Sequence, residues 1–192
     1  MSKKESAPGV EKDADGLVLQ KYRSMVLVVV PPKEFGEECL RYARSSLFNV
    51  HVGTWSVSTQ SPELVRGRLQ DEFQVDGQLS QAGMAAYSGV LFAGGEGALD
   101  LTQNPDALRL AREAHSSGKL VAAWGHAVAI LAAAGVLKGR RATGHPSVAA
   151  AMRATGARVS SRQVEHDGNV VTGLDEASGM RFGKALAAVV GI

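Results

Sequence analysis

In two short stretches of the chain, groups that can bind charge or transfer a proton lie next to a sharp turn. Gly125 and His126 follow directly on the apolar run 119–124, and a helical pattern continues from residue 127. A strand that turns straight into a helix holds the turn residue above the sheet, where backbone N–H groups and the helix dipole favour an anion. The imidazole of His126 can exchange a proton near neutral pH. We therefore predict a site at this turn, although Gly125 has no side chain.

The second stretch also ends a predicted strand. The apolar residues 89–93 run directly into Gly94, Gly95, Glu96 and Gly97. Glycines at a strand end expose backbone amides, so these residues are candidates for contact with a ligand. Glu96 has two interpretations, a contact to the ligand or a solvated surface carboxylate.

The elements that must position these residues alternate along the chain. A continuous β-branched run predicts a strand buried on both faces, and helical spacing of apolar residues predicts the covering helices. Predicted strands are 25–30, 49–55, 89–93 and 119–124, and residues 157–172 are predicted to form a hairpin. Predicted helices are 35–47, 105–117, 127–134, one within 141–156 that Pro146 opens, and 177–190. This order predicts an α/β fold with a mostly parallel sheet, helices on both faces and a pocket at the carboxyl ends of the strands.

The overall composition limits the class of protein. We expect residues 1–22 to be a flexible tail, because they are nearly free of apolar side chains, and residues 23–192 to form a single domain in which 56–89 is irregular. A net charge of +2 without basic clusters predicts no nucleic-acid partner. No apolar stretch has the length of a membrane span or signal peptide, so we predict a cytoplasmic protein without a membrane partner. The histidines show no zinc-ligand spacing, and no metal is predicted.

Four stretches resemble the ThiJ/PfpI superfamily, the class I glutamine amidotransferase-like group that includes the Parkinson-disease protein and the PfpI protease. The stretches are 93–98, 119–131 (ordinarily containing Ala-Ile-Cys-His-Gly-Pro), 134–147 and 168–172. The resemblance implies a flavodoxin-like three-layer sandwich, usually a homodimer, in a family that includes proteases, glyoxalases, deglycases, isonitrile hydratases, chaperones and regulators. We expect a small-molecule substrate or ligand and no cofactor.

The resemblance also implies a set of site residues. Its members use a nucleophilic cysteine at the turn, a carboxylate on the first helix and often a following histidine. Here Gly125 replaces the cysteine, Cys39 stands where the carboxylate is expected, and His126 matches. Backbone amides of Gly95 and His126 are expected to hold an oxyanion. The residues implied to bind the ligand or oxyanion are Gly94, Gly95, Glu96, Gly125 and Ala127.

Cys39 has two interpretations. Its thiol faces the space above Gly125, where the imidazole of His126 assists proton transfer, or it is a small apolar residue of the helix face. In the second case a shift of one or two residues places Glu37 or Glu38 where the family carboxylate belongs. His126 likewise serves either proton transfer or a structural hydrogen bond.

Two further positions leave alternatives open. Gly125 either marks a member that has lost its chemistry or enlarges the pocket for a bulkier substrate. Asp175 and Glu176 stand where the family usually has Ser-Arg-Gly-Pro. They either cap the last helix or supply the acid or base lost elsewhere.

These residues lead to two functional hypotheses. The first is a cofactor-independent enzyme, of lyase, hydratase or isomerase type, which acts on a small carbonyl-like or electrophilic metabolite through Cys39 and His126. Because Gly125 carries no thiol, we do not expect a standard glyoxalase, deglycase or cysteine peptidase. The second is a non-catalytic dimer that binds a metabolite or another protein.

Overall fold

The main sheet of the protein is built as the alternating pattern predicts. The structure is a computed structural model that describes residues 10–12, 18–20, 22–59 and 64–191. Within these residues the main sheet has seven strands. Their order is β13 (Val164–Asp167), β14 (Val170–Gly173), β10 (Leu120–Trp124), β9 (Gly89–Phe92), β3 (Ser24–Val29), β5 (Val52–Ser58) and β8 (Gly77–Gln78). All neighbouring pairs are parallel except β13 and β14, which form the predicted hairpin.

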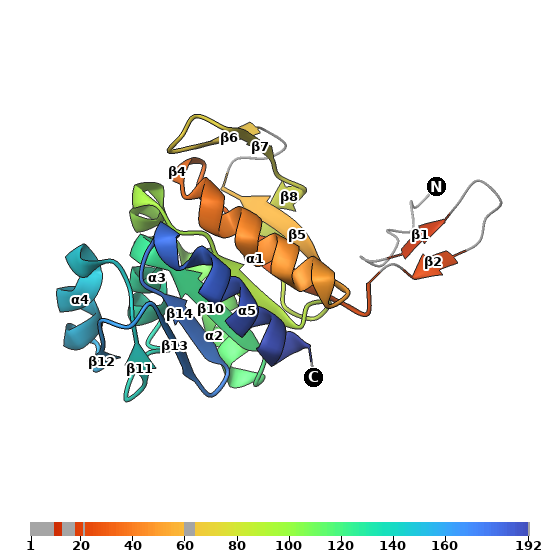
Figure 1. The fold of residues 1–192 in the computed structure, drawn as a ribbon. Helices are drawn as coiled ribbons and strands as arrows, with labels where there is room; N and C mark the ends of the chain where they lie inside the picture. Colours follow the sequence, from red (N-terminus) through yellow and green to blue (C-terminus); the bar gives the residue numbers. More distant parts are fainter. Residues whose placement is uncertain (1–9, 13–17, 21, 60–63, 192) are drawn as a thin grey trace.

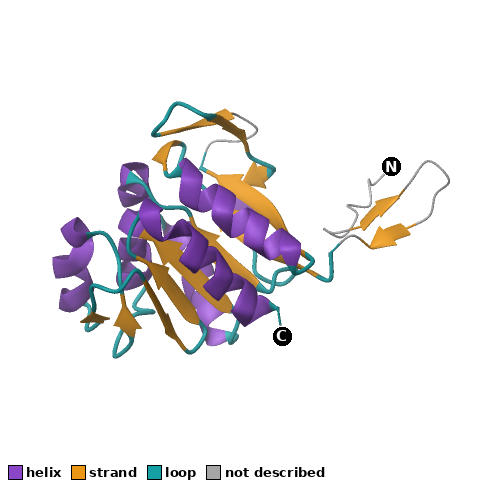
Figure 2. Ribbon diagram, viewed as in Figure 1, coloured by secondary structure: helices purple, strands orange, loops and turns teal. Residues whose placement is uncertain are grey.

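Helices cover both faces of this sheet, which confirms the flavodoxin-like α/β arrangement (Figures 1 and 2). On one face lie α1 (Glu37–Asn49) and α5 (Gly179–Val190), and on the other lie α2 (Pro105–Ser116) and α3 (Val128–Ala133). The helix α4 (Ala149–Ala154) follows α3 and packs against it. The N-terminus of α2 forms as its sequence predicts, because the side chain of Asn104 accepts hydrogen bonds from the backbone of Asp106 and Ala107.

The central strand β3 shows why the β-branched runs are continuous. Leu27 and Val29 belong to the apolar core under α2 and α3, whereas Val26 and Val28 belong to the core under α1 and α5. Successive side chains of a strand point to opposite faces. A strand covered on both faces therefore needs an apolar residue at every position.

Two parts of the chain differ from the sequence prediction. Residues 56–89 are more regular than expected, because β5 extends to Ser58 and β8 adds to the sheet edge. In a separate small sheet, β6 (Leu64–Gly67) pairs with β4 (Lys33–Phe35) on one side and with β7 (Glu72–Gln74) on the other. Within 141–156 the helix begins at Pro146 as predicted, with a 3₁₀ turn (Pro146–Val148) that continues into α4. The short strand β11 (Arg141–Ala142), which pairs with β12 (Arg158–Val159), was not predicted. Strands this short leave too little periodic pattern to detect.

The predicted tail 1–22 lies mostly outside the described residues. Within the described part, β1 (Val10–Lys12) pairs antiparallel with β2 (Val18–Gln20). The single domain over 23–192 stays a prediction. Among the described residues, no helix has the length and apolar character needed to cross a membrane.

Candidate functional site

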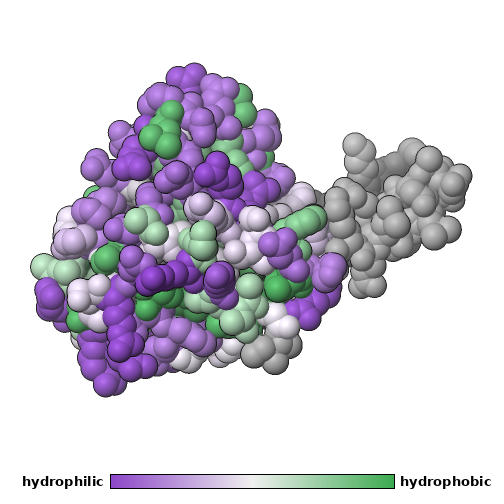
Figure 3. Space-filling view, in the orientation of Figure 1, coloured by the Kyte–Doolittle hydropathy of each residue, from purple (hydrophilic) through white to green (hydrophobic). Residues whose placement is uncertain are grey.

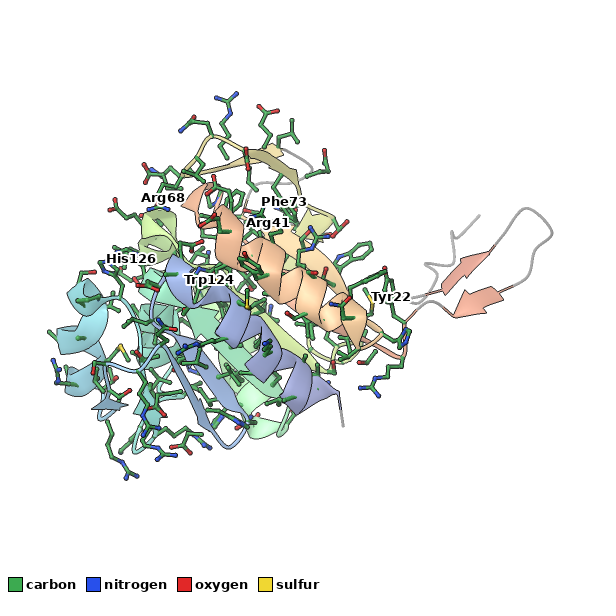
Figure 4. The ribbon with its side chains drawn as sticks, viewed as in Figure 1. Tyr22, Arg41, Arg68, Phe73, Trp124 and His126 are labelled. Atoms are coloured by element: carbon green, nitrogen blue, oxygen red, sulfur yellow. The ribbon has the colours of Figure 1, made fainter. Side chains whose placement is uncertain are left out.

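A cavity of about 320 Å³ opens at the carboxyl ends of β9 and β10, where the sequence predicts a pocket. The predicted site residues that line it are Gly95, Glu96, Gly125, His126, Asp175 and Glu176. The lining residues that were not predicted are Gly36, Arg68, His145 and Ala177. Figure 4 shows Arg68, Trp124 and His126 around the N-terminal ends of α1 and α5, where this cavity lies.

The turn after β10 has the left-handed backbone geometry of an elbow. Gly125 is buried and has a φ of +59°, a backbone conformation that residues other than glycine rarely adopt. A Cβ built on Gly125 would meet no other atom within 4 Å. The position at which the family resemblance implies a nucleophile is therefore open space in this protein.

Glu176 supplies a carboxylate to the cavity from the loop before α5. Its Oε1 accepts a hydrogen bond of 2.5 Å from Trp124 Nε1, and its Oε2 accepts one of 2.9 Å from the backbone N–H of Cys39. An added Cβ on Gly36 would collide with this carboxylate. The glycine at residue 36, the indole N–H and the α1 backbone thus form a fitted seat for the Glu176 side chain.

Cys39 itself lies outside the cavity. Its side chain is fully buried in the core between the sheet and α1, and burial raises the pKa of its thiol, with further contributions from the negative charges of Glu176 and Asp175. A thiol that resists ionisation is a poor nucleophile. The position expected for the family carboxylate is therefore filled by a core residue, while its backbone N–H holds the carboxylate of Glu176.

Neither neighbouring glutamate restores a carboxylate from α1. The Oε1 of Glu37 accepts a 2.5 Å hydrogen bond from the backbone of Leu69, and the side chain of Glu38 is exposed. Both residues face the groove between α1 and the β6–β7 hairpin instead of the cavity. Glu38, predicted as an acid or base, thus lies away from the site.

His126 stacks on His145 at one side of the cavity. The ring centroids lie 4.1 Å apart with an angle of 23° between the planes. Burial lowers the pKa of His126, repulsion from His145 lowers it further, and the carboxylate of Glu96 partly opposes both effects. The lowered pKa favours the neutral form of the His126 imidazole at pH 7.

His145 contacts the elbow through both its backbone and its side chain. Its N–H donates to the carbonyl of Gly125 over 3.2 Å, and its Nδ1 lies 2.8 Å from the hydroxyl of Ser147 and accepts the Ser147 N–H at 3.3 Å. Because Nδ1 is an acceptor, neutral His145 carries its proton on Nε2. His145 also lines the cavity, where its ring stacks on that of His126.

The predicted oxyanion residues separate into two groups. Gly95 and His126 line the cavity, and within the described part of the chain their backbone N–H groups donate to no acceptor. Gly94 and Ala127 do not line it. A side chain on Gly94 would collide with Trp124, and Ala127 is fully buried in the core under α3. Their contribution is to close packing behind the site.

Asp175 is committed to the helix that follows. Its carboxylate accepts the backbone N–H of Ser178 at 3.1 Å, and the two residues form a capping box. Of the two acidic residues predicted in this loop, Glu176 alone directs its carboxylate to the seat beside Gly36. Among the described residues, no group of three or more histidine, cysteine or acidic side chains is placed to hold a metal ion.

The fold and the site define a flavodoxin-like α/β protein with a sharp strand-to-helix turn and a cavity at the carboxyl edge of its sheet. A sequence profile of the DJ-1/PfpI family matches residues 25–189, and the chain belongs to this family.

Several known proteins are similar to this chain in sequence or in fold. An uncharacterised protein of Methanocaldococcus jannaschii is 31% identical over 150 residues, which cover 77% of this chain and 73% of that one. A deglycase of Pyrococcus horikoshii is 30% identical over 108 residues, covering 56% and 65% of the two chains. In fold, the chain matches a ThiJ/PfpI domain protein from Brachyspira murdochii with a TM-score of 0.83 at 24% identity, over 88% and 97% of the chains. Drosophila melanogaster DJ-1beta matches with a TM-score of 0.78 at 22% identity, over 88% and 91%.

Proposed function

We propose that the protein is a cofactor-independent enzyme that moves a proton on a carbon atom next to a carbonyl group of a small metabolite. Isomerisation through an enolate and elimination begin with removal of this proton, and hydration or addition to a C=C bond beside the carbonyl ends with its return. The observation that carries the proposal is the carboxylate of Glu176, which is held at two oxygens beside the open space above Gly125.

The surrounding groups suit the charges that this reaction creates. Glu176 takes the proton from the carbon, and the electron pair of the broken C–H bond moves into a C=C bond while the carbonyl oxygen becomes an enolate. The unpartnered N–H groups of Gly95 and His126 stabilise that oxygen. Neutral His126 accepts or returns a proton at the substrate, and reprotonation of the carbon from Glu176 completes the exchange.

Thiol chemistry is a weaker explanation of the same site. The Pyrococcus horikoshii relative is named a deglycase, but here residue 125 has no side chain and the thiol of Cys39 lies in the core with a raised pKa. We therefore expect no deglycase, glyoxalase or peptidase activity of the thiol-dependent kind.

Hydrogen–deuterium exchange tests the proposal without knowledge of the natural substrate. Hydroxyacetone, a small uncharged ketone, is incubated with the enzyme in D₂O, and loss of its proton signals beside the carbonyl is followed by NMR. We expect exchange faster than in buffer and faster than with Glu176→Gln. Hydroxyacetone that shifts the ring signals of His126 but exchanges no faster than in buffer would favour the second hypothesis, a non-catalytic binding protein, for which the missing nucleophile at Gly125 is the supporting observation.

A further inference from the structure

Arg68 brings a positive charge to the cavity from outside the predicted motifs. It follows β6 in the turn that leads to β7, its side chain is exposed, and it lines the same cavity as His126 and Glu176 (Figure 4). Within the described part of the chain its guanidinium forms no hydrogen bond or ion pair. Arg66, two residues earlier, pairs with Glu72 at 3.1 Å.

The backbone around Arg68 is fixed to the start of α1. The N–H of Arg68 donates to the carbonyl of Phe35 over 3.0 Å, and the N–H of Leu69 donates to the carboxylate of Glu37. A side chain on Gly67 would collide with that carboxylate. Glu37 therefore acts as a positioning residue that clamps the turn and directs Arg68 toward the site.

None of the described acidic residues of the cavity pairs with the guanidinium of Arg68. Asp175 is occupied by the N-terminus of the last helix, and both oxygens of Glu176 already accept hydrogen bonds. Glu96 is exposed, and its charge acts on His126. A guanidinium that faces a cavity with no internal partner is a ready site for an anionic group of a ligand.

We infer that Arg68 binds a carboxylate of the substrate, so that the substrate is a small carbonyl compound that also carries a carboxylate. The inference rests on the proposed function, in which the carbonyl oxygen of the substrate accepts hydrogen bonds from the backbone amides of Gly95 and His126. A singly charged carboxylate matches the planar fork of one arginine. A phosphate would bring nearly two negative charges close to three acidic side chains and is disfavoured.

Pyruvate and its uncharged amide, pyruvamide, form a matched pair of probes. Binding is measured by NMR titration of the ring signals of His126 and His145 in the full-length chain and in three variants. We expect pyruvate to bind about tenfold more tightly than pyruvamide, the effect of one hydrogen bond to a charged group. Arg68→Gln should remove that preference, Arg68→Lys should retain part of it, and the control Arg66→Gln should leave it unchanged.

The outcomes separate this inference from the proposed function. Equal binding of the two probes, or a pyruvate preference that survives in Arg68→Gln, overturns the carboxylate subsite while leaving a carbonyl-binding pocket. If neither probe shifts either histidine, the subsite is overturned together with the pocket on which it rests.

Discussion

Cys39 illustrates how residue type and residue environment differ in what they predict. A lone cysteine near an elbow invites a nucleophile assignment, but its surroundings raise the pKa of the thiol and exclude solvent. We expect iodoacetamide to label Cys39 only when the chain unfolds, as followed by mass spectrometry along a denaturant series. Cys39→Ala should cost about 1 kcal/mol of the free energy of unfolding and leave ketone exchange intact. Rapid labelling of the folded chain would show that the thiol faces the cavity.

The pH dependence of His126 follows from its lowered pKa. The folded chain binds this proton more weakly than the unfolded chain, in which the pKa is about 6.5. As the pH falls below about 6.5, the unfolded state takes up more protons and the free energy of unfolding decreases.

NMR titration should give His126 a pKa below 6.5. This pKa should be raised in His145→Asn and lowered further in Glu96→Gln. His166→Asn, a change at an exposed histidine outside the cavity, is the control. A pKa above 6.5 in the unaltered protein would contradict the assigned role as a neutral acceptor.

At the scale of elements, the N-terminal end of α1 and the loop before α5 meet at Gly36. The Glu176 carboxylate fits there because Gly36 has no side chain. In Gly36→Ala the carboxylate must leave its seat and lose the hydrogen bonds from Cys39 and Trp124. We expect ketone exchange to fall by about 100-fold, the usual effect of a misplaced catalytic group.

The control for this change is Gly83→Ala, because a Cβ on Gly83 meets no other atom within 4 Å and its φ is not positive. Exchange rates of the two variants are compared under identical conditions. Equal rates in Gly36→Ala and the unaltered protein would show that the seat of Glu176 is unimportant for the chemistry.

For the whole molecule, homodimer formation is a prediction from the family resemblance. Hydrophobic side chains lie in small groups among hydrophilic ones on the face shown in Figure 3. Tyr42 and Phe48 of α1 and Met180 of α5 are 38%, 55% and 55% exposed. Sedimentation equilibrium should give twice the chain mass of 20.1 kDa. Phe48→Lys combined with Met180→Lys should weaken the dimer, whereas Leu99→Lys, at an exposed residue between β9 and α2, should not. A single-chain mass at all concentrations would refute dimer formation.

Local sequence patterns anticipate the fold and the location of the site, but they miss several of the interactions that complete it. Asn104 and Pro105 define the start of α2 by their own chemistry, and the β-branched run 25–30 identifies the central strand. The seat of Glu176 joins groups 137 residues apart along the chain, so no local spacing could reveal it. Arg68 was missed because it stands in the turn between the short strands β6 and β7, where no periodic pattern surrounds it. Its position becomes meaningful only when the contacts of this turn with Phe35 and Glu37 are known.

The central claim is that Glu176, and not a thiol, moves the proton. The most direct test is the rate of hydroxyacetone deuteration measured in parallel for Glu176→Gln, Cys39→Ala and the exposed control Glu38→Gln. Loss of a general base typically costs about 100-fold or more. We predict that loss for Glu176→Gln and rates close to that of the unaltered protein for the other two variants. Exchange that survives in Glu176→Gln but disappears in Cys39→Ala would contradict the claim.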